Sequence, residues 1–208
     1  MNKKLKLETV EHSCLPGDLH VAVYVTERTG EKAVSSSAWR RREKGYGRKL
    51  LAEMVSSHLG NGNFRVEGKE GEKPEAYLDN RPVEVSISHC PGLCGAALST
   101  RRSVGIDIEH AGRKVHPLLG QRILSSEERV ICSDMPVLQL WTVKESTLKW
   151  FGSGLRHPMN RLSIVNVDGK RLTVRLRNGQ LAECCSFRFG EYWLAVTFDS
   201  DREVLPGI

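Results

Sequence analysis

The stretch "SVGIDIEH" at residues 103–110 places two carboxylates, Asp107 and Glu109, inside an otherwise apolar segment. Its alternation predicts a β-strand, because successive side chains of a strand point to opposite faces. One face then carries the two acids, and their carboxylates lie about 7 Å apart along it, close enough to hold one cation between them. The apolar face enters the core and consists of Val104, Ile106 and Ile108.

Gly105 shares the acidic face of this predicted strand. A residue without a side chain lets a ligand approach the backbone, so the glycine adds to the picture of a binding site. The alternative is a half-exposed strand whose outer face is acidic without any function, and this segment alone does not decide between the two.

The segments around this strand divide into two similar sets. Upstream we predict a strand at 18–27, a helix over 35–60, a short strand inside the long loop 60–80, and two strands at 83–89 and 94–100 joined by "CPGL". The serines at 35–37 offer the helix an N-cap, while Gly45 and Gly47 weaken its first turns and leave a start near Gly47 as the alternative. Downstream we predict helices within 116–132 and 135–152 and strands at 162–167, 172–177, 184–189 and 192–198. The predicted class is α+β, with one antiparallel sheet and helical cover in each half.

Composition limits the function classes. The chain has 208 residues and a formal net charge of +6, which favours anionic partners. The start lacks the apolar run of a signal peptide, and "YWLAVTF" is too short to span a bilayer, so we expect a cytoplasmic protein. None of the six cysteines shows CxxC spacing, which argues against a zinc site, and we expect them to be reduced.

The second decisive segment is "LWTVKESTLKWFG" at 140–152. On a helix, Trp141, Glu145 and Leu148 share a face, with Lys144 and Lys149 to either side of Glu145. A surface ion pair between Glu145 and Lys149 would explain the spacing of these two residues. It would not explain the presence of Lys144 or the apolar crowding by Trp141 and Trp150. Three carboxylates suit Mg²⁺, which takes its remaining oxygens from phosphates and water, and lysines beside it hold those phosphates.

Together the two segments resemble the signature of the 4′-phosphopantetheinyl transferases. The family pattern is (V/I)G(I/V)D, a gap of about forty residues, and (F/W)xxKE(A/S)xxK, and either half alone would be weak. Each fixed position of the pattern is met here, by Gly105, Asp107, Trp141, Lys144, Glu145, Ser146 and Lys149.

The resemblance extends from about residue 40 to 155. "KPEAYLDNRPVEVSISHC" is similar to the family's GKP loop and SHS strand, "GRKLLAE" to its basic helix start, and "ILSSEE" to its FFSxxE segment. Binding positions that match are Arg48, Lys73, Pro74, Ser88 and His89. Two departures are Cys90, in place of a serine, and Glu72, in place of a glycine, and the second places a negative charge beside Lys73.

The length is similar to that of the longer, Sfp-type members of this family. The resemblance implies two like-folded halves, 1–102 and 103–208, related by a pseudo-two-fold axis, with one site in the cleft between them. It also implies a monomer that transfers the 4′-phosphopantetheine group of coenzyme A to a serine of an acidic acyl or peptidyl carrier protein. The activity would be that of a holo-[acyl-carrier-protein] synthase, which releases adenosine 3′,5′-bisphosphate.

The resemblance also implies a role for each matched residue. Asp107, Glu109 and Glu145 would hold Mg²⁺, or Mn²⁺ in its place. Glu145, or a water beside it, would take the serine proton, and Lys149 would stabilise the charge that develops on the pyrophosphate. Substrate phosphates would be bound by Ser88, His89 and Lys144, and the 3′-phosphate by Arg48, with Arg40 or Arg41 as further candidates.

Two other functions use the same features. A Mg²⁺-dependent nuclease or phosphohydrolase would use the acids but gives no reason for the KESxxK helix. A basic nucleic-acid-binding module would use the net charge of +6, yet only Trp39 and Tyr46 flank the arginine cluster at 40–48. The sequence therefore favours the transferase, with neither nucleic acid nor membrane as a partner.

Overall fold

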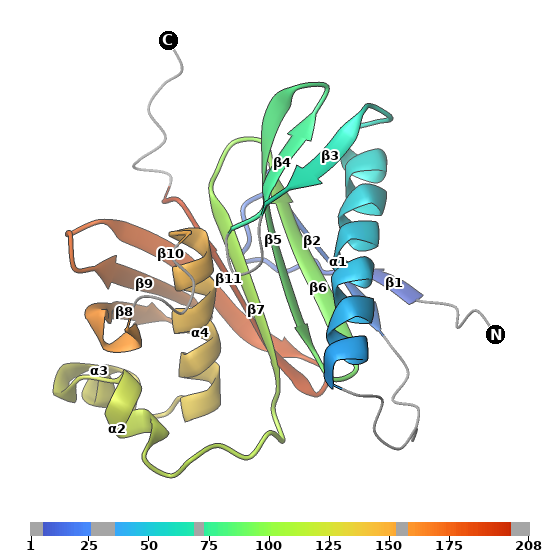
Figure 1. The fold of residues 1–208 in the computed structure, drawn as a ribbon. Coiled ribbons are helices and arrows are strands. Elements are labelled where there is room, and N and C mark those ends of the chain that lie inside the picture. Colours follow the sequence, from blue (N-terminus) through green and yellow to red (C-terminus); the bar gives the residue numbers. More distant parts are fainter. Residues whose placement is uncertain (1–5, 26–35, 69–72, 153–157, 201–208) are drawn as a thin grey trace.

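The computed structural model describes residues 6–25, 36–68, 73–152 and 158–200, with only the backbone of 36–44. Two antiparallel sheets make up most of these ranges (Figure 1). The first has the strand order β1-β2-β6-β5-β4-β3, with bounds Lys6–Thr9 (β1), Leu19–Val25 (β2), Phe64–Glu67 (β3), Glu75–Leu78 (β4), Arg81–Cys90 (β5) and Leu93–Ser99 (β6). The second has the order β7-β11-β10-β9-β8, with bounds Val104–His110 (β7), Leu162–Asp168 (β8), Arg171–Leu176 (β9), Leu181–Phe189 (β10) and Tyr192–Phe198 (β11).

One long helix covers the outer face of each sheet (Figure 1). Helix α1 (Ser36–His58) packs its Leu50 and Met54 against the first sheet, and α4 (Val137–Trp150) packs its Val143 and Leu148 against the second. Short helices precede and follow α4: α2 (Leu119–Ile123), α3 (Ser126–Ile131) and the 3₁₀ turn η2 (Met159–Arg161). The α+β class with two sheet-and-helix halves is therefore confirmed, while the boundary at 102/103 stays a prediction.

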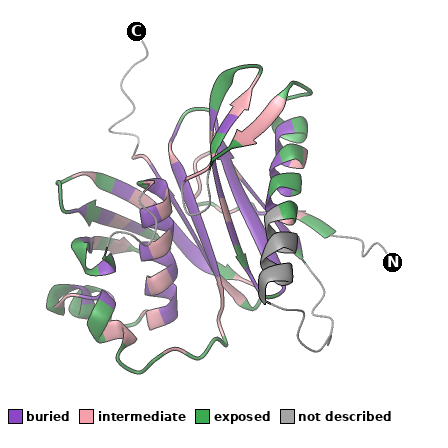
Figure 2. Cartoon of the chain, viewed as in Figure 1, coloured by how far each residue is buried: buried purple, intermediate pink, exposed green. Residues whose placement is uncertain are grey.

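A third core lies between the two sheets. The predicted apolar face of β7 belongs to it, since Val104, Ile106 and Ile108 are all buried there with Val21 and Phe187 from opposite sheets. Figure 2 shows how strongly burial is concentrated in the strands. Each such buried side chain contributes about 1.5–3 kcal/mol of transfer free energy. The acidic face of β7 is consequently turned toward α4.

Serine side chains join the two sheets at β5 and β7. Because β7 is an edge strand, alternate N–H groups lack a partner within its own sheet. The hydroxyl of Ser86 accepts a hydrogen bond from the N–H of Ile106 at 3.0 Å, and that of Ser88 accepts one from the N–H of Ile108 at 3.3 Å. These bonds satisfy buried donors and fix the position of β5 relative to β7.

Gly105 serves the packing of α4 rather than the approach of a ligand. A Cβ at this position would collide with the carbonyl oxygen of Ser146 and the backbone nitrogen of Trp150. The space beside Gly105, where we expected a ligand to approach, is therefore filled by the backbone of α4. This close approach places Glu145 of α4 over the acidic face of β7.

Helix α1 begins at Ser36, at the serines that were predicted to cap it, and it continues through both glycines of "GYG", so the alternative start near Gly47 was wrong. Gly47 lets the helix approach β5, since a Cβ there would come within 2.6 Å of the Ile87 side chain. The loop 60–80 contains two strands, β3 and β4, because Asp79 and Asn80 adopt the positive φ of a tight turn before β5.

The expectation that all six cysteines are reduced was also wrong. Cys14 and Cys185 form a disulfide with Cα atoms 5.9 Å apart, which links the segment before β2 to β10 in the second sheet. The other four cysteines are buried and lie outside this disulfide. Among the described residues, no helix is both long enough and apolar enough to cross a membrane.

Candidate metal and transfer site

Three carboxylates converge between β7 and α4. Asp107, Glu109 and Glu145 each offer an oxygen, and these oxygens lie within 4.8 Å of one another. The two strand acids share a face because they are two residues apart, and Gly105 brings the helix close enough for Glu145 to join them. The structure thus brings together the three predicted metal ligands.

The two oxygens of Asp107 have different surroundings. Oδ1 accepts hydrogen bonds from Lys149 Nζ at 2.8 Å and from Ser88 Oγ at 2.9 Å. Oδ2 is buried and has no hydrogen-bond partner among the described residues, although Asp107 is only 3% exposed. Since a buried carboxylate oxygen without a partner is costly, this atom calls for a cation or a donor that is not a protein group.

Lys149 and Ser88 complete the polar centre of the site. Lys149 Nζ donates to Ser88 Oγ at 2.9 Å as well as to Asp107, so residues of β5, β7 and α4 meet at one point. Burial lowers the pKa of the lysine, but the charges of Asp107 and Glu145 outweigh that effect and raise its pKa. A positive charge is therefore held beside the carboxylates at neutral pH.

Two of the carboxylates are harder to ionise than usual. Burial, and then the charge of Asp107, raise the pKa of Glu145 to about 7, while Lys149 opposes this. The pKa of Glu109 is raised by the same two causes and held down by Arg113 and Lys149. Glu145 can therefore exchange a proton near neutral pH, and a divalent cation would favour the ionised form of all three acids.

The donor set fits Mg²⁺. Hard divalent cations take oxygen ligands, and Mg²⁺ fills the rest of its six positions with water and substrate phosphate. Three carboxylates, an orphaned buried oxygen on Asp107 and a lysine at the rim match this chemistry.

Lys144 lies away from this cluster, contrary to the prediction that it binds phosphate. Its side chain is fully buried on the far side of α4, and Nζ lies 2.8 Å from Glu128 Oε1. The same ammonium donates to the backbone carbonyls of Ile123, Met159 and Leu162. Glu128 Oε2 also lies 3.0 Å from Nζ, so five protein oxygens surround the ammonium, no donor is left for a substrate phosphate, and we assign Lys144 a structural role.

His89 lies on the opposite face of β5 from Ser88, because neighbouring side chains of a strand alternate. That face is covered by α1, where Gly47 meets Ile87 two residues before the histidine. Arg48 follows Gly47 and is exposed, as is His89. The predicted binding residues therefore fall into two groups, one at the acidic cluster and one beside α1; the side chains of Arg40 and Arg41 lie outside the described residues.

Lys73 connects the first half to the end of α4. Its Nζ donates to Glu84 at 2.7 Å and to the carbonyl of Trp150 at 3.4 Å, and its chain passes beside Gly152. A cation at a helix C-terminus is favourable, so this contact helps to fix α4. Pro74 follows, partly buried, immediately before β4.

Arg113 and Glu128 were not among the site residues predicted from the sequence. Arg113 Nη1 pairs with Glu109 Oε1, and a basic residue shortly after the DxE motif was the available signal. Glu128 forms a capping box with Ser125, a pattern readable in "SSEE", but its pairing with Lys144 depends on how α3 and α4 pack.

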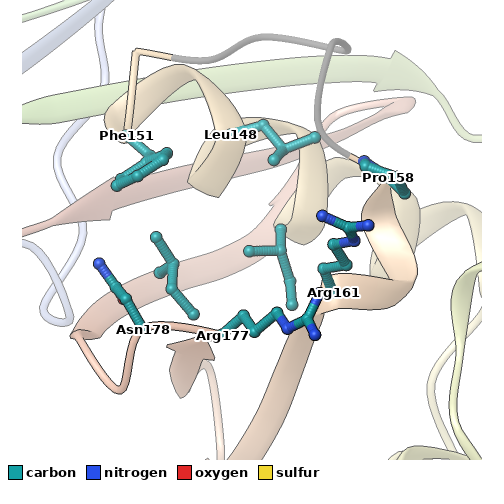
Figure 3. A pocket seen from close by; sticks show the side chains of 8 residues that line it. Leu148, Phe151, Pro158, Arg161, Arg177 and Asn178 are labelled. Carbon is teal, nitrogen blue, oxygen red and sulfur yellow. The ribbon is translucent and has the colours of Figure 1, made fainter.

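A separate pocket of about 290 Å³ opens at the C-terminal end of α4. Figure 3 shows the side chains around it, with Arg161 and Arg177 beside an apolar floor. The apolar lining residues are Leu148, Phe151, Pro158, Leu162 and Leu176. Its lining contains none of the three clustered acids.

Comparison with known proteins adds one finding to this geometry. The family model of the 4′-phosphopantetheinyl transferase superfamily matches residues 103–197, just under half of the chain. This range runs from the start of β7 almost to the end of β11 and contains all three clustered acids and Lys149. No curated protein matches the chain.

Proposed function

We propose that this protein transfers the 4′-phosphopantetheine group of coenzyme A to a serine of an acyl or peptidyl carrier protein, since the family model of the 4′-phosphopantetheinyl transferase superfamily matches residues 103–197. The product is the holo carrier, and adenosine 3′,5′-bisphosphate is released. The observation that carries this proposal is the convergence of three carboxylates and Lys149, with Asp107 Oδ2 left without a hydrogen-bond partner in the described part of the chain.

Asp107, Glu109 and Glu145 would hold the metal. Mg²⁺, or Mn²⁺ in its place, supplies positive charge to the pyrophosphate when bound. Lys149 adds a second positive charge at the same place and favours the oxygens that become more negative as the phosphodiester bond breaks. Ser88 keeps this lysine aimed at the site through its hydroxyl.

Glu145 is the proposed general base. The serine oxygen of the carrier bonds to the phosphorus that bears pantetheine, and the bond from that phosphorus to the oxygen of adenosine bisphosphate breaks. The serine proton passes to Glu145, or to a water beside it. Burial and the charge of Asp107 raise the pKa of Glu145, which favours proton acceptance, while a bound cation would oppose this effect and keep the carboxylate ionised and ready to accept the proton.

The remaining predicted contacts form the proposed site for the adenosine end. Arg48 and His89 are exposed beside α1, and we assign them to the 3′-phosphate and nearby polar atoms. We also assign Lys73 and Pro74 to substrate binding, with Lys73 partly neutralised by Glu84. The net charge of +6 suits a carrier that is acidic around its serine.

We also propose an oligomeric state and a cellular location for the protein. Ser88 from the first sheet and Asp107 from the second meet in one chain, which supports a monomeric, Sfp-type arrangement with one site between two halves. We propose the cytoplasm as its location, where coenzyme A and apo carrier proteins occur together.

Intact-mass spectrometry of an apo carrier protein tests this function. Incubation with the protein, coenzyme A and Mg²⁺ should add one phosphopantetheine, about 340 Da. EDTA and Glu145→Ala should abolish the shift, whereas Glu67→Ala, which removes an exposed acid on β3, should not.

The transferase assignment would be overturned by the absence of any shift with several carrier classes, together with no binding of coenzyme A. Metal-dependent cleavage of DNA or of phosphate esters under the same conditions would then favour a nuclease or phosphohydrolase that uses the same three acids.

A further inference from the structure

Arg113 is the exposed cation of the acidic cluster. It lies in the turn after β7, where its N–H donates to the carbonyl of His110 at 2.8 Å. Its guanidinium pairs with Glu109 Oε1 and lies 5.9 Å from the ring centre of Trp141. The side chain is 47% exposed, whereas that of Glu109 is 14% exposed.

The two cations of the cluster differ in how firmly they are held. Lys149 belongs to α4 and is bonded to both Asp107 and Ser88, so it moves only with the helix. Arg113 stands on a turn whose neighbours Gly112 and Lys114 are exposed. A long side chain on such a turn can leave its partner at little cost, since an exposed ion pair contributes only about 0–1 kcal/mol.

A metal ion and the guanidinium need the same carboxylate. Arg113 occupies an oxygen of Glu109, which is one of the three clustered acids, and its positive charge opposes the approach of another cation. We propose that Arg113 is a displaceable counter-ion of the metal site, which competes with the metal for Glu109. This inference rests on the metal role assigned to the cluster under the proposed function.

The consequence is a site that holds a divalent cation less tightly than three carboxylates and Lys149 alone would. Once displaced, the guanidinium remains at the rim of the cluster, where anionic oxygens of a metal-bound substrate can receive it. The same residue therefore disfavours the metal alone and favours the metal together with a phosphate-bearing ligand.

Titration with Mn²⁺, followed by electron paramagnetic resonance and without coenzyme A, tests this competition. Arg113→Gln should lower the Kd for Mn²⁺ about three-fold, the size expected for loss of an exposed ion pair. Arg113→Lys keeps the charge and should stay near the wild type. Lys114→Gln removes the same charge from the next position of the same turn and should also leave the Kd unchanged.

The competition would be overturned if Arg113→Gln weakened Mn²⁺ binding, since Arg113 would then orient Glu109 for the metal. It would equally be overturned if Arg113→Gln and Lys114→Gln had the same effect, because only the overall charge would matter. Both results leave the metal site and the proposed transferase intact. Failure of the wild type to bind Mn²⁺, or binding unaffected by Asp107→Asn, would instead overturn the metal assignment and this inference with it.

Discussion

Burial and the neighbouring charge of Asp107 both raise the pKa of Glu145. The raised pKa means that the folded protein holds this proton more tightly than the unfolded chain does. Between the ordinary pKa of 4.5 and the folded pKa of about 7, the folded state binds more protons, so its stability falls as pH rises through this window. The carboxylate is thus a source of instability that a bound cation would relieve.

Glu145→Gln should therefore stabilise the protein in the presence of EDTA. At pH 7.5 we expect the variant to exceed the wild type by about 1–3 kcal/mol in free energy of unfolding, and at pH 4.5 the difference should vanish. Thermal and urea unfolding at both pH values measure this. A variant that is less stable than the wild type at pH 7.5 would contradict the raised pKa.

Lys144 illustrates how a matched motif residue can serve the fold rather than the substrate. Its ammonium is fully buried and ties α4 to α3, to the carbonyl of Ile123 and to the chain that enters β8. Glu128, its partner, also accepts from the N–H of Ile164 at 2.8 Å. The pair holds the side of α4 opposite Glu145, and it therefore supports the site without entering it.

Lys144→Met should destabilise the protein by about 3–5 kcal/mol, because it leaves the buried charge of Glu128 uncompensated. The double variant Glu128→Gln/Lys144→Met removes that charge and should recover part of the loss. Urea unfolding of wild type and both variants provides the comparison. A large rise in the KM for coenzyme A with unchanged stability would instead restore Lys144 as a phosphate-binding residue.

At the scale of the elements, the contact between β7 and α4 creates the site. The strand presents two acids on one face, and the helix presents Glu145 and Lys149 one turn apart. These side chains meet because Gly105 removes the Cβ that would hold the helix away from the strand. The glycine of the motif is thus explained by packing.

Gly105→Ala should separate α4 from β7 and destabilise the fold by about 2–4 kcal/mol, since backbone atoms cannot move aside as a flexible side chain can. Gly45→Ala is the matched control, because no atom of the described residues lies within 4 Å of a Cβ there and the residue is exposed within α1. That control should stabilise the protein by about 0.5–1 kcal/mol. Circular dichroism during thermal unfolding gives both values, and equal effects of the two changes would show that the contact is not tight.

At the scale of the whole molecule, the site depends on how the two sheets are held together. Ser86 and Ser88 satisfy the free edge of β7, and Lys73 reaches from the first half to the end of α4. On the other side, the segment before β2 is fixed to the second sheet by the disulfide from Cys14 and by Arg171, which donates to the Cys14 carbonyl at 2.9 Å. The two sheets are therefore linked by hydrogen bonds at the β5–β7 contact and by a disulfide and a hydrogen bond near Cys14.

Reduction of the disulfide should lower the melting temperature of the protein. The bond joins positions 171 residues apart, and a link between such distant positions stabilises by roughly 3–5 kcal/mol in the chain-entropy model. Cys14→Ser should melt near the reduced wild type and should not respond to reductant. A wild type whose melting temperature is the same with and without reductant would show that the bond does not form in solution.

The sequence by itself determined the two-half α+β plan, the apolar face of β7 and the three clustered acids. The plan and the apolar face follow from the local repeat of side chains, which is two residues in a strand and three to four in a helix. The three acids follow from the spacing of the two motifs, which the superfamily match supports. The same local information placed Lys149 beside Glu145.

Only the tertiary structure decided what each polar side chain faces. Lys144 and Lys149 both flank Glu145 in the sequence, yet one is enclosed by Glu128 and backbone carbonyls and the other meets Asp107 and Ser88. Likewise, Ser88 and His89 are adjacent but lie on opposite faces of β5. Contacts such as these, together with Cys14–Cys185, join residues far apart in the chain, and only the packing of the two sheets and α4 brings them within bonding distance.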